Sequence, residues 1–197
     1  MDKVKVILIH GNGGGWPKEN WLPPVANKLK KIPGLKVIFR QFPDPVLARA
    51  KYWLPFLRKL GADENTILVG HSSGAIAAMR YAEKHKIFGS ILVAAYHTDL
   101  GMREEKLSGY FRKPWQWSAI RQNQKWIAQF SSVDDPFIPI REARFVAKKL
   151  KSEYHEFKHG GHFSSFDGKM IDFPEIIVTI DRKFKQWQKR RRPMSKI

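Results

Sequence analysis

The sequence of 197 residues contains no cysteine. This absence excludes a disulfide scaffold, a thiolate metal site and a cysteine nucleophile, and it agrees with a reducing compartment. Long apolar runs are also missing, because no segment approaches the roughly 18 apolar residues of a membrane-spanning helix. The apolar start contains Lys5 and leads into glycines instead of a small-residue cleavage site. We therefore expect a cytoplasmic protein without a signal peptide or a membrane partner.

Acidic residues are scarce: 18 Asp and Glu stand against 36 Lys and Arg, which gives a formal net charge of +18. Such an imbalance concerns partners and solubility more than the fold. The hydrophobic content of 43% and the aromatic content of 13% are ordinary for a globular chain. Disordered and fibrous classes are therefore excluded, and the length predicts one domain.

The positive charge is concentrated at the end of the chain. Residues 182–197 carry eight Lys and Arg and no acid, so residues 1–181 keep +10. We predict a catalytic domain over residues 1–181 and a basic helix end and tail over residues 182–197. A solvated helix end explains this segment most simply, and the alternatives are nuclear import or non-specific nucleic-acid binding.

Apolar runs and helical patterns alternate along the chain. We predict strands at residues 4–10, 35–39, 66–69, 91–95, 127–130 and 154–157, and helices at 21–31, 45–60, 73–85, 141–151 and from 174. Near-continuous apolar strands in such alternation predict an α/β fold, a mostly parallel twisted sheet with helices on both faces. Ligands of this architecture bind at the carboxyl ends of the strands.

One segment, residues 96–118, interrupts this alternation. It is too long for a plain connection and contains Tyr110, Phe111, Trp115 and Trp117. These aromatic side chains, together with Trp16, are candidates for the wall of a substrate pocket. The alternative is that they only bury the segment against the sheet, because large aromatic residues dominate cores as well as sites.

The strongest local motif is G-x-S-x-G at residues 70–74, between an apolar strand and a helix rich in small residues. This placement is typical of a nucleophile elbow, in which a sharp turn exposes a serine above the sheet. The motif predicts Ser72 as the nucleophile. An ordinary serine N-cap is the alternative.

A serine nucleophile needs a base and an acid, which α/β-hydrolases supply in the order Ser, acid, His. Asp134 and Asp135 follow a predicted strand, and we favour Asp135 because of the Asp-Pro turn that it begins. His162 lies on a glycine-rich loop after the last predicted strand and is the expected base. A metal pair with the nearby His159 is disfavoured, since no carboxylate stands at ligand spacing, and no cofactor is expected.

An oxyanion hole requires two N–H groups directed at the developing negative charge. The N–H of Ser73, which follows the nucleophile, is one candidate. The second should come from the glycine loop after the first strand, where we choose Asn12, with Gly13 as the alternative. A phosphate-binding loop is excluded there, because neither G-x-G-x-x-G nor G-K-[ST] is present.

Taken together, several segments resemble one family. They read HGNGGG at residues 10–15, WLPF at 53–56, GHSSGAIAAMRYAE at 70–83, SGYF at 108–111, PWQW at 114–117 and DDPF at 134–137. The chain is similar over residues 4–180 to the compact serine hydrolases of the α/β-hydrolase superfamily that include retinoblastoma-binding protein 9 and YdeN-like proteins. The resemblance implies a triad of Ser72, Asp135 and His162.

The resemblance also implies hydrolysis of small ester, amide or aminoacyl substrates. We expect a monomer. The family's namesake carries an L-x-C-x-E type sequence associated with the retinoblastoma protein, but Ala62 replaces the cysteine here. Inheritance of that partner is therefore not expected. The alternative function is a basic module that binds protein or nucleic acid and retains a vestigial hydrolase site.

Overall fold

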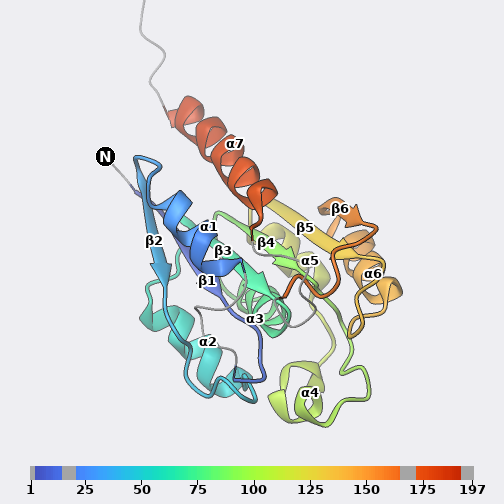
Figure 1. The fold of residues 1–197 in the computed structure, drawn as a ribbon. Coiled ribbons are helices and arrows are strands. Elements are labelled where there is room, and N and C mark those ends of the chain that lie inside the picture. Colours follow the sequence, from blue (N-terminus) through green and yellow to red (C-terminus); the bar gives the residue numbers. More distant parts are fainter. Residues whose placement is uncertain (1–2, 15–20, 165–171, 192–197) are drawn as a thin grey trace, which may run out of the picture.

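The computed structural model describes residues 3–14, 21–164 and 172–191. Its centre is a parallel sheet of six strands in the order β2-β1-β3-β4-β5-β6 (Figure 1). The strands are β1 (Val4–Ile9), β2 (Leu35–Phe39), β3 (Thr66–His71), β4 (Gly89–Val93), β5 (Trp126–Ser132) and β6 (Glu153–Phe157). All six predicted strands are present, with every bound within two residues of its predicted position.

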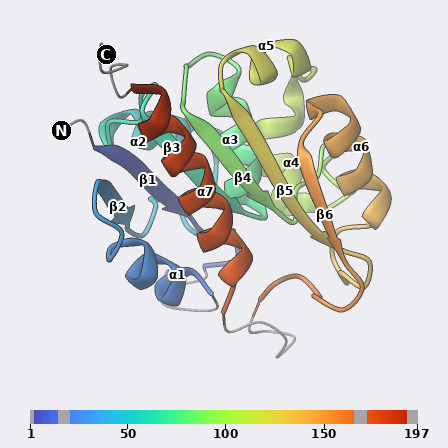
Figure 2. The same cartoon turned by 90° about the horizontal axis from the view of Figure 1, so that it is seen from above.

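Helices cover both faces of the sheet. They are α1 (Leu22–Leu29), α2 (Ala50–Lys59), α3 (Ser73–Ala82), α4 (Arg103–Ser108), the 3-10 turn η1 (Tyr110–Arg112), α5 (Trp117–Gln122), α6 (Ile140–Leu150) and α7 (Pro174–Arg191). Figure 2 shows α7 crossing one face, with α2 and α3 behind the sheet. This arrangement confirms the predicted α/β fold.

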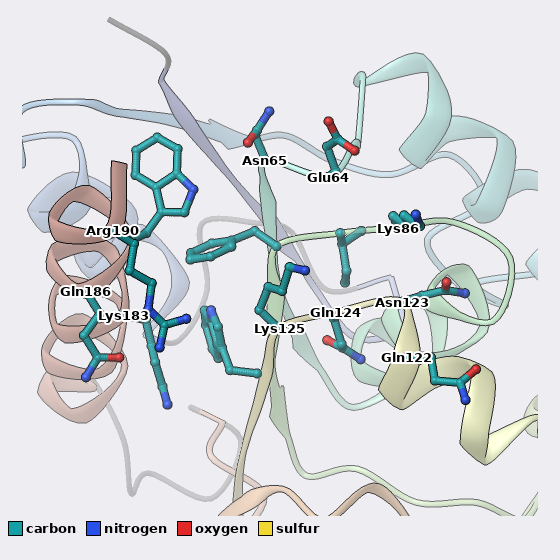
Figure 3. Close-up of a pocket in the computed structure, with 14 residues that line it drawn as sticks. Glu64, Asn65, Lys86, Gln122, Asn123, Gln124, Lys125, Lys183, Gln186 and Arg190 are labelled. Atoms are coloured by element: carbon teal, nitrogen blue, oxygen red, sulfur yellow. The ribbon is translucent and has the colours of Figure 1, made fainter. Parts of the chain in front are cut away.

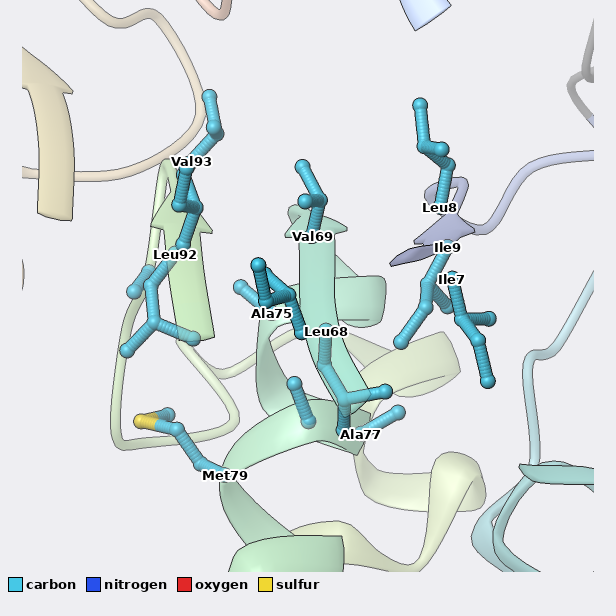
Figure 4. Packing of buried hydrophobic residues seen from close by; sticks show 14 of the residues in the cluster. Ile7, Leu8, Ile9, Leu68, Val69, Ala75, Ala77, Met79, Leu92 and Val93 are labelled. Atoms are coloured by element: carbon cyan, nitrogen blue, oxygen red, sulfur yellow. The ribbon is translucent and has the colours of Figure 1, made fainter. Parts of the chain in front are cut away.

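The core lies between the central strands and α3. Ile7, Leu68 and Leu92 come from three neighbouring strands and are fully buried (Figure 4). Ala75 and Ala77 on α3 are fully buried as well. Because these side chains are small, the helix axis can approach the sheet closely, and the turn that joins β3 to α3 is held between two packed elements.

The helix predicted over residues 45–60 begins only at Ala50, so the prediction was wrong for residues 45–49. Asp44 and Ala48 have φ of 53° and 49°, which a right-handed helix cannot contain. The Asp44 carboxylate instead accepts hydrogen bonds from the N–H and the guanidinium of Arg49. Residues 44–49 therefore form a turn, and α2 starts after it.

The segment at residues 96–118 carries α4 and η1 and is fixed to the body of the protein by Arg80 of α3. The guanidinium donates to the carbonyl oxygens of Tyr110 and Lys113 at 2.8 and 2.6 Å, and its carbon lies 3.6 Å from the ring centre of Trp115. Glu83 neutralises this arginine at 2.7 Å. In the described part of the chain, none of the helices combines the length and apolarity that crossing a membrane requires.

Candidate active site

Ser72 occupies the turn between β3 and α3 with φ 54° and ψ −121°, a backbone conformation that non-glycine residues rarely adopt. The two flanking glycines explain how this turn fits. A Cβ on Gly70 would lie 2.3 Å from the carbonyl oxygen of Gly74, and a Cβ on Gly74 would lie 2.4 Å from that of Ile9. No larger residue fits at either position, so the strained turn depends on both glycines.

The imidazole of His162 contacts the carboxylate of Asp135, with Nδ1 at 2.9 Å from Oδ2 and 3.1 Å from Oδ1. Both side chains are buried, at 11% and 2% exposure. The same carboxylate accepts the N–H groups of Phe137 and Ile138 at 2.9 and 3.0 Å. Because these two N–H groups fix the carboxylate, it presents a defined acceptor to the histidine ring.

Asp134 has a different role. Its Oδ1 accepts hydrogen bonds from the hydroxyl of Ser132 at 2.6 Å and from the N–H groups of Gly160 and Gly161 at 3.0 and 2.7 Å. Asp134 thus ties the end of β5 to the glycine loop that carries His162. Of the two aspartates weighed from the sequence, Asp135 is the one that touches the imidazole.

His71 precedes the serine and is a buried support of the site. Its Nε2 lies 2.8 Å from the carbonyl oxygen of His162, and the two rings are 4.9 Å apart. Burial lowers the pKa of His71 to about 3, and the neighbouring His162 adds to the effect. His71 is therefore neutral, with its proton on Nε2, and it holds the backbone of His162 beside the elbow.

The glycine loop after β1 is fixed by backbone and imidazole contacts. Nε2 of His10 accepts the N–H of Phe42 at 3.0 Å, so its Nδ1 carries the proton that binds the carbonyl oxygen of Gly11 at 2.6 Å. The N–H of Gly13 donates to the carbonyl oxygen of Val46 at 3.0 Å. Since the Gly13 N–H has this acceptor, the geometry favours Asn12 over Gly13 as the second oxyanion donor.

Glu105 of α4 joins the predicted oxyanion residues, and the sequence analysis did not identify it. Its Oε1 accepts the side-chain amide of Asn12 at 2.8 Å and the hydroxyl of Ser73 at 3.4 Å. The residue is only 4% exposed, and burial raises the pKa of its carboxyl group. The hydroxyl of Tyr96 lies 3.3 Å from that of Ser73. The sequence gives no sign of this role, because nothing in its local pattern distinguishes Glu105 from the exposed Glu104.

The aromatic residues predicted to line the pocket make two different sets of contacts. Phe111 stacks on Tyr96 at 5.6 Å, close to the Ser73 hydroxyl that Tyr96 contacts, and Tyr110 is buried beside it in η1. Trp115 instead lies on Arg80 and stacks on Trp117 at 5.4 Å.

Trp16 lies outside the described residues. One aromatic side chain that the sequence analysis missed, Phe137, packs edge-on against His162 at 5.0 Å and is 48% exposed. His159, by contrast, is 86% exposed at its side chain and lies 3.8 Å from Asp134, so it does not share the buried surroundings of His162. The exposed Phe137 ring therefore gives the imidazole of His162 an apolar neighbour that solvent can reach.

Comparisons with known proteins identify the family and the fold. A family model described as "Serine hydrolase" matches residues 6–182. The chain is 47% identical over 179 residues to serine hydrolase RBBP9 of Rattus norvegicus, covering 90% of this chain and 94% of that protein. The crystal structure of the ydeN gene product of B. subtilis superposes with a TM-score of 0.81 at 26% identity, covering 92% and 98% of the two chains.

Mouse alpha/beta hydrolase domain-containing protein 10 superposes with a TM-score of 0.66 at 19% identity, covering 93% of this chain and 90% of that one. At this identity the likeness concerns the fold alone. The family model and the RBBP9 relative each extend over most of the chain. The chain therefore belongs to the serine hydrolase family, and it is a hydrolase of the α/β-hydrolase fold.

Proposed function

We propose that this enzyme cleaves small carboxylic esters, amides or aminoacyl compounds through a triad of Ser72, His162 and Asp135. The observation that carries the proposal is the 2.9 Å contact of Asp135 with Nδ1 of His162, beside a serine held at φ 54° on its elbow. A carboxylate on Nδ1 fixes the tautomer whose Nε2 can accept a proton.

In this mechanism Ser72 Oγ attacks the carbonyl carbon while His162 takes the hydroxyl proton. His162 then gives that proton to the leaving group, and an acyl-enzyme remains on Ser72. A water molecule, deprotonated by the same imidazole, releases the acid. The negative oxygen is stabilised by the N–H of Ser73, which as a first-turn group of α3 has no acceptor within its helix, and by the N–H of Asn12.

The acyl group lies, in this proposal, against aromatic rings of the segment at residues 96–118. Phe111 and Tyr110 are supported as pocket residues by their place beside Tyr96, which contacts Ser73. Trp115 and Trp117 have weaker support. Trp115 meets Phe111 at 6.2 Å, but its closest contacts are with Arg80, the His97 carbonyl oxygen and Trp117. Phe137 adds an exposed apolar face over His162.

The test is labelling by a fluorophosphonate together with hydrolysis of a p-nitrophenyl ester. Ser72→Ala should abolish labelling and lower kcat by about 10⁴-fold or more. Ser118→Ala, which removes an exposed hydroxyl from α5, is the matched control and should keep both. Hydrolysis by Ser72→Ala at the parent rate would refute the triad. Parallel assays of an ester and an aminoacyl anilide then define the substrate class.

A further inference from the structure

A cleft of about 600 Å³ opens at the end of the sheet opposite to Ser72. It is bordered by residues at the amino ends of strands: Asn65 before β3, Phe88 before β4, Lys125 before β5, and Trp126, the first residue of β5. Because β3 is six residues long, the cleft and the elbow are about 20 Å apart. The cleft is therefore separate from the catalytic residues.

The lining of the cleft is strongly cationic. Figure 3 shows Lys183 and Arg190 on α7 along one side, Lys86 on the other, and Lys125 between them. Glu64 is the one carboxylate among the described lining residues. Lys183 is neutralised in part by Glu153 at 3.0 Å. The side chains of Lys86, Lys125 and Arg190 are exposed, so their charges face the cleft and solvent.

Aromatic rings lie among these cations. Trp126 and Trp187 are half-buried and line the cleft, and the buried Phe88 contacts both rings at 6.0 and 6.2 Å. The ammonium of Lys183 lies 5.6 Å from the ring centre of Trp126. Side-chain amides complete the wall, among them Gln122 and Gln186 in Figure 3. A ligand here would meet positive charge, flat apolar faces and hydrogen-bonding amides together.

We propose that this cleft binds single-stranded nucleic acid, with phosphates on the cations and bases against the indole rings. Single-stranded binders combine a positive groove with aromatic platforms, which is the combination found here. The volume lies within the range of about 300–1,000 Å³ that is usual for small ligands, and it can hold a base with its phosphate. The double variant Lys86→Glu and Lys125→Glu tests this directly.

The measurement is fluorescence anisotropy of a labelled 20-nucleotide single strand with the full chain, in 50 to 200 mM salt. We expect the Lys86→Glu and Lys125→Glu double variant to weaken binding about tenfold or more. It should also lower the salt slope by about 0.7 for each phosphate that the protein no longer neutralises. The matched control, Lys36→Glu with Lys148→Glu, makes the same charge change at exposed positions outside the cleft. It should weaken binding by less than threefold.

Trp187→Ala separates stacking from charge. It should weaken binding of the single strand roughly tenfold, the effect expected from the loss of one stacked base. It should leave the affinity for heparin unchanged. Equal losses in both lysine double variants, equal affinity for duplex and single strand, or no binding at 50 mM salt would each overturn the proposal. Competition by free UMP at the same nucleotide concentration would make a mononucleotide the occupant and also overturn it. Ester hydrolysis, expected at the parent rate in the lysine variants, reports that they are folded.

Discussion

At the carboxyl ends of the strands the backbone is packed so closely that single atoms decide whether the site forms, whereas the amino ends of the same strands border an open cationic cleft. Gly74 and Gly89 illustrate the difference. A Cβ on Gly74 would meet the carbonyl oxygen of Ile9 at 2.4 Å, and a Cβ on Gly89 would meet the ring of Trp126 at 2.2 Å. The first neighbour is fixed backbone, but the second is a half-buried side chain with a cleft beside it. Equally short contacts therefore have unequal costs.

The largest effect is expected from Gly74→Ala. The added methyl group must displace the end of β1, and we expect a loss of about 4 kcal/mol or more in the free energy of unfolding, with no fluorophosphonate labelling. Gly89→Ala should cost about 1–3 kcal/mol, because the group that must move is a side chain at the cleft and not backbone, and it should keep labelling. Urea denaturation and indole fluorescence measure both. Similar losses in the two variants would contradict the contrast between the two ends.

His71 and His85 lie near opposite ends of α3 and give the next contrast. The pKa of His71 is about 3 in the folded protein against 6.5 in the unfolded chain, so the unfolded state binds the proton first as pH falls. The stability contributed by neutral His71 is complete above pH 6.5 and is lost toward pH 3, at about 1.4 kcal/mol for each pH unit.

The variant His71→Gln lacks this titration, and its free energy of unfolding should depend less on pH between 6.5 and 4 than that of the parent. Burial also lowers the pKa of His85, but this side chain is half-buried, whereas that of His71 is buried. The His85→Gln curve should therefore follow the parent curve more closely than the His71→Gln curve does. Unfolding in urea at a series of pH values provides the measurement. A His71→Gln curve parallel to that of the parent would show that His71 does not carry the acid sensitivity.

Two tryptophans extend the comparison to side-chain packing. Trp115 lies on the guanidinium of Arg80 at 3.6 Å and donates its indole N–H to the carbonyl oxygen of His97 at 2.8 Å. Trp187 at the cleft makes ring contacts with Phe184 and Phe88 at 5.8 and 6.2 Å. We expect Trp115→Ala to lower the free energy of unfolding by about 2–4 kcal/mol and Trp187→Ala by roughly half as much.

Esters of different chain length decide what Trp115 does for catalysis. Its contacts favour packing, so Trp115→Ala should lower kcat/KM for all chain lengths by similar factors. A selective loss for one chain length, without a change in Tm, would instead make Trp115 a wall of the acyl pocket. Trp115→Phe keeps a ring on Arg80 but loses the indole N–H, and it should lie between the parent and the alanine variant.

The sequence was sufficient to predict the sheet, the elbow and the contact between Asp135 and His162. Each depends on a local pattern: an apolar run, glycines at fixed spacing, or an Asp-Pro turn. It was not sufficient for Glu105 or Arg80. Their roles arise from contacts with residues far away in the chain, Asn12 for the first and Trp115 for the second, and no local pattern marks them. The late start of α2 was also missed. The turn before it combines the Asp44–Arg49 hydrogen bonds with carbonyl oxygens of Pro45 and Val46 that accept N–H groups from the distant glycine loop.

The smallest expected effect concerns two carboxyl groups, the buried Glu105 and the exposed Glu64. The raised pKa of Glu105 means that the folded state resists its ionisation, so stability falls as pH rises above 4.5, the ordinary value. Glu105→Gln keeps an acceptor for Asn12 and Ser73 without the charge. Its free energy of unfolding should equal that of the parent at low pH and exceed it by about 1 kcal/mol at pH 8. Glu64→Gln, at an exposed position of the cleft, should change the free energy of unfolding by less than about 0.5 kcal/mol.

Glu105→Ala removes the acceptor altogether. The side-chain amide of Asn12 then loses its acceptor, and the Ser73 hydroxyl keeps the Tyr96 hydroxyl alone. This costs about 1–3 kcal/mol and loosens the loop that is proposed to bind the oxyanion. The alanine variant should therefore have a lower kcat with little change in KM, whereas the glutamine variant should retain most of the parent kcat. If both variants lose kcat equally, the charge of Glu105 is needed in the reaction itself, and its part is more than the positioning of Asn12.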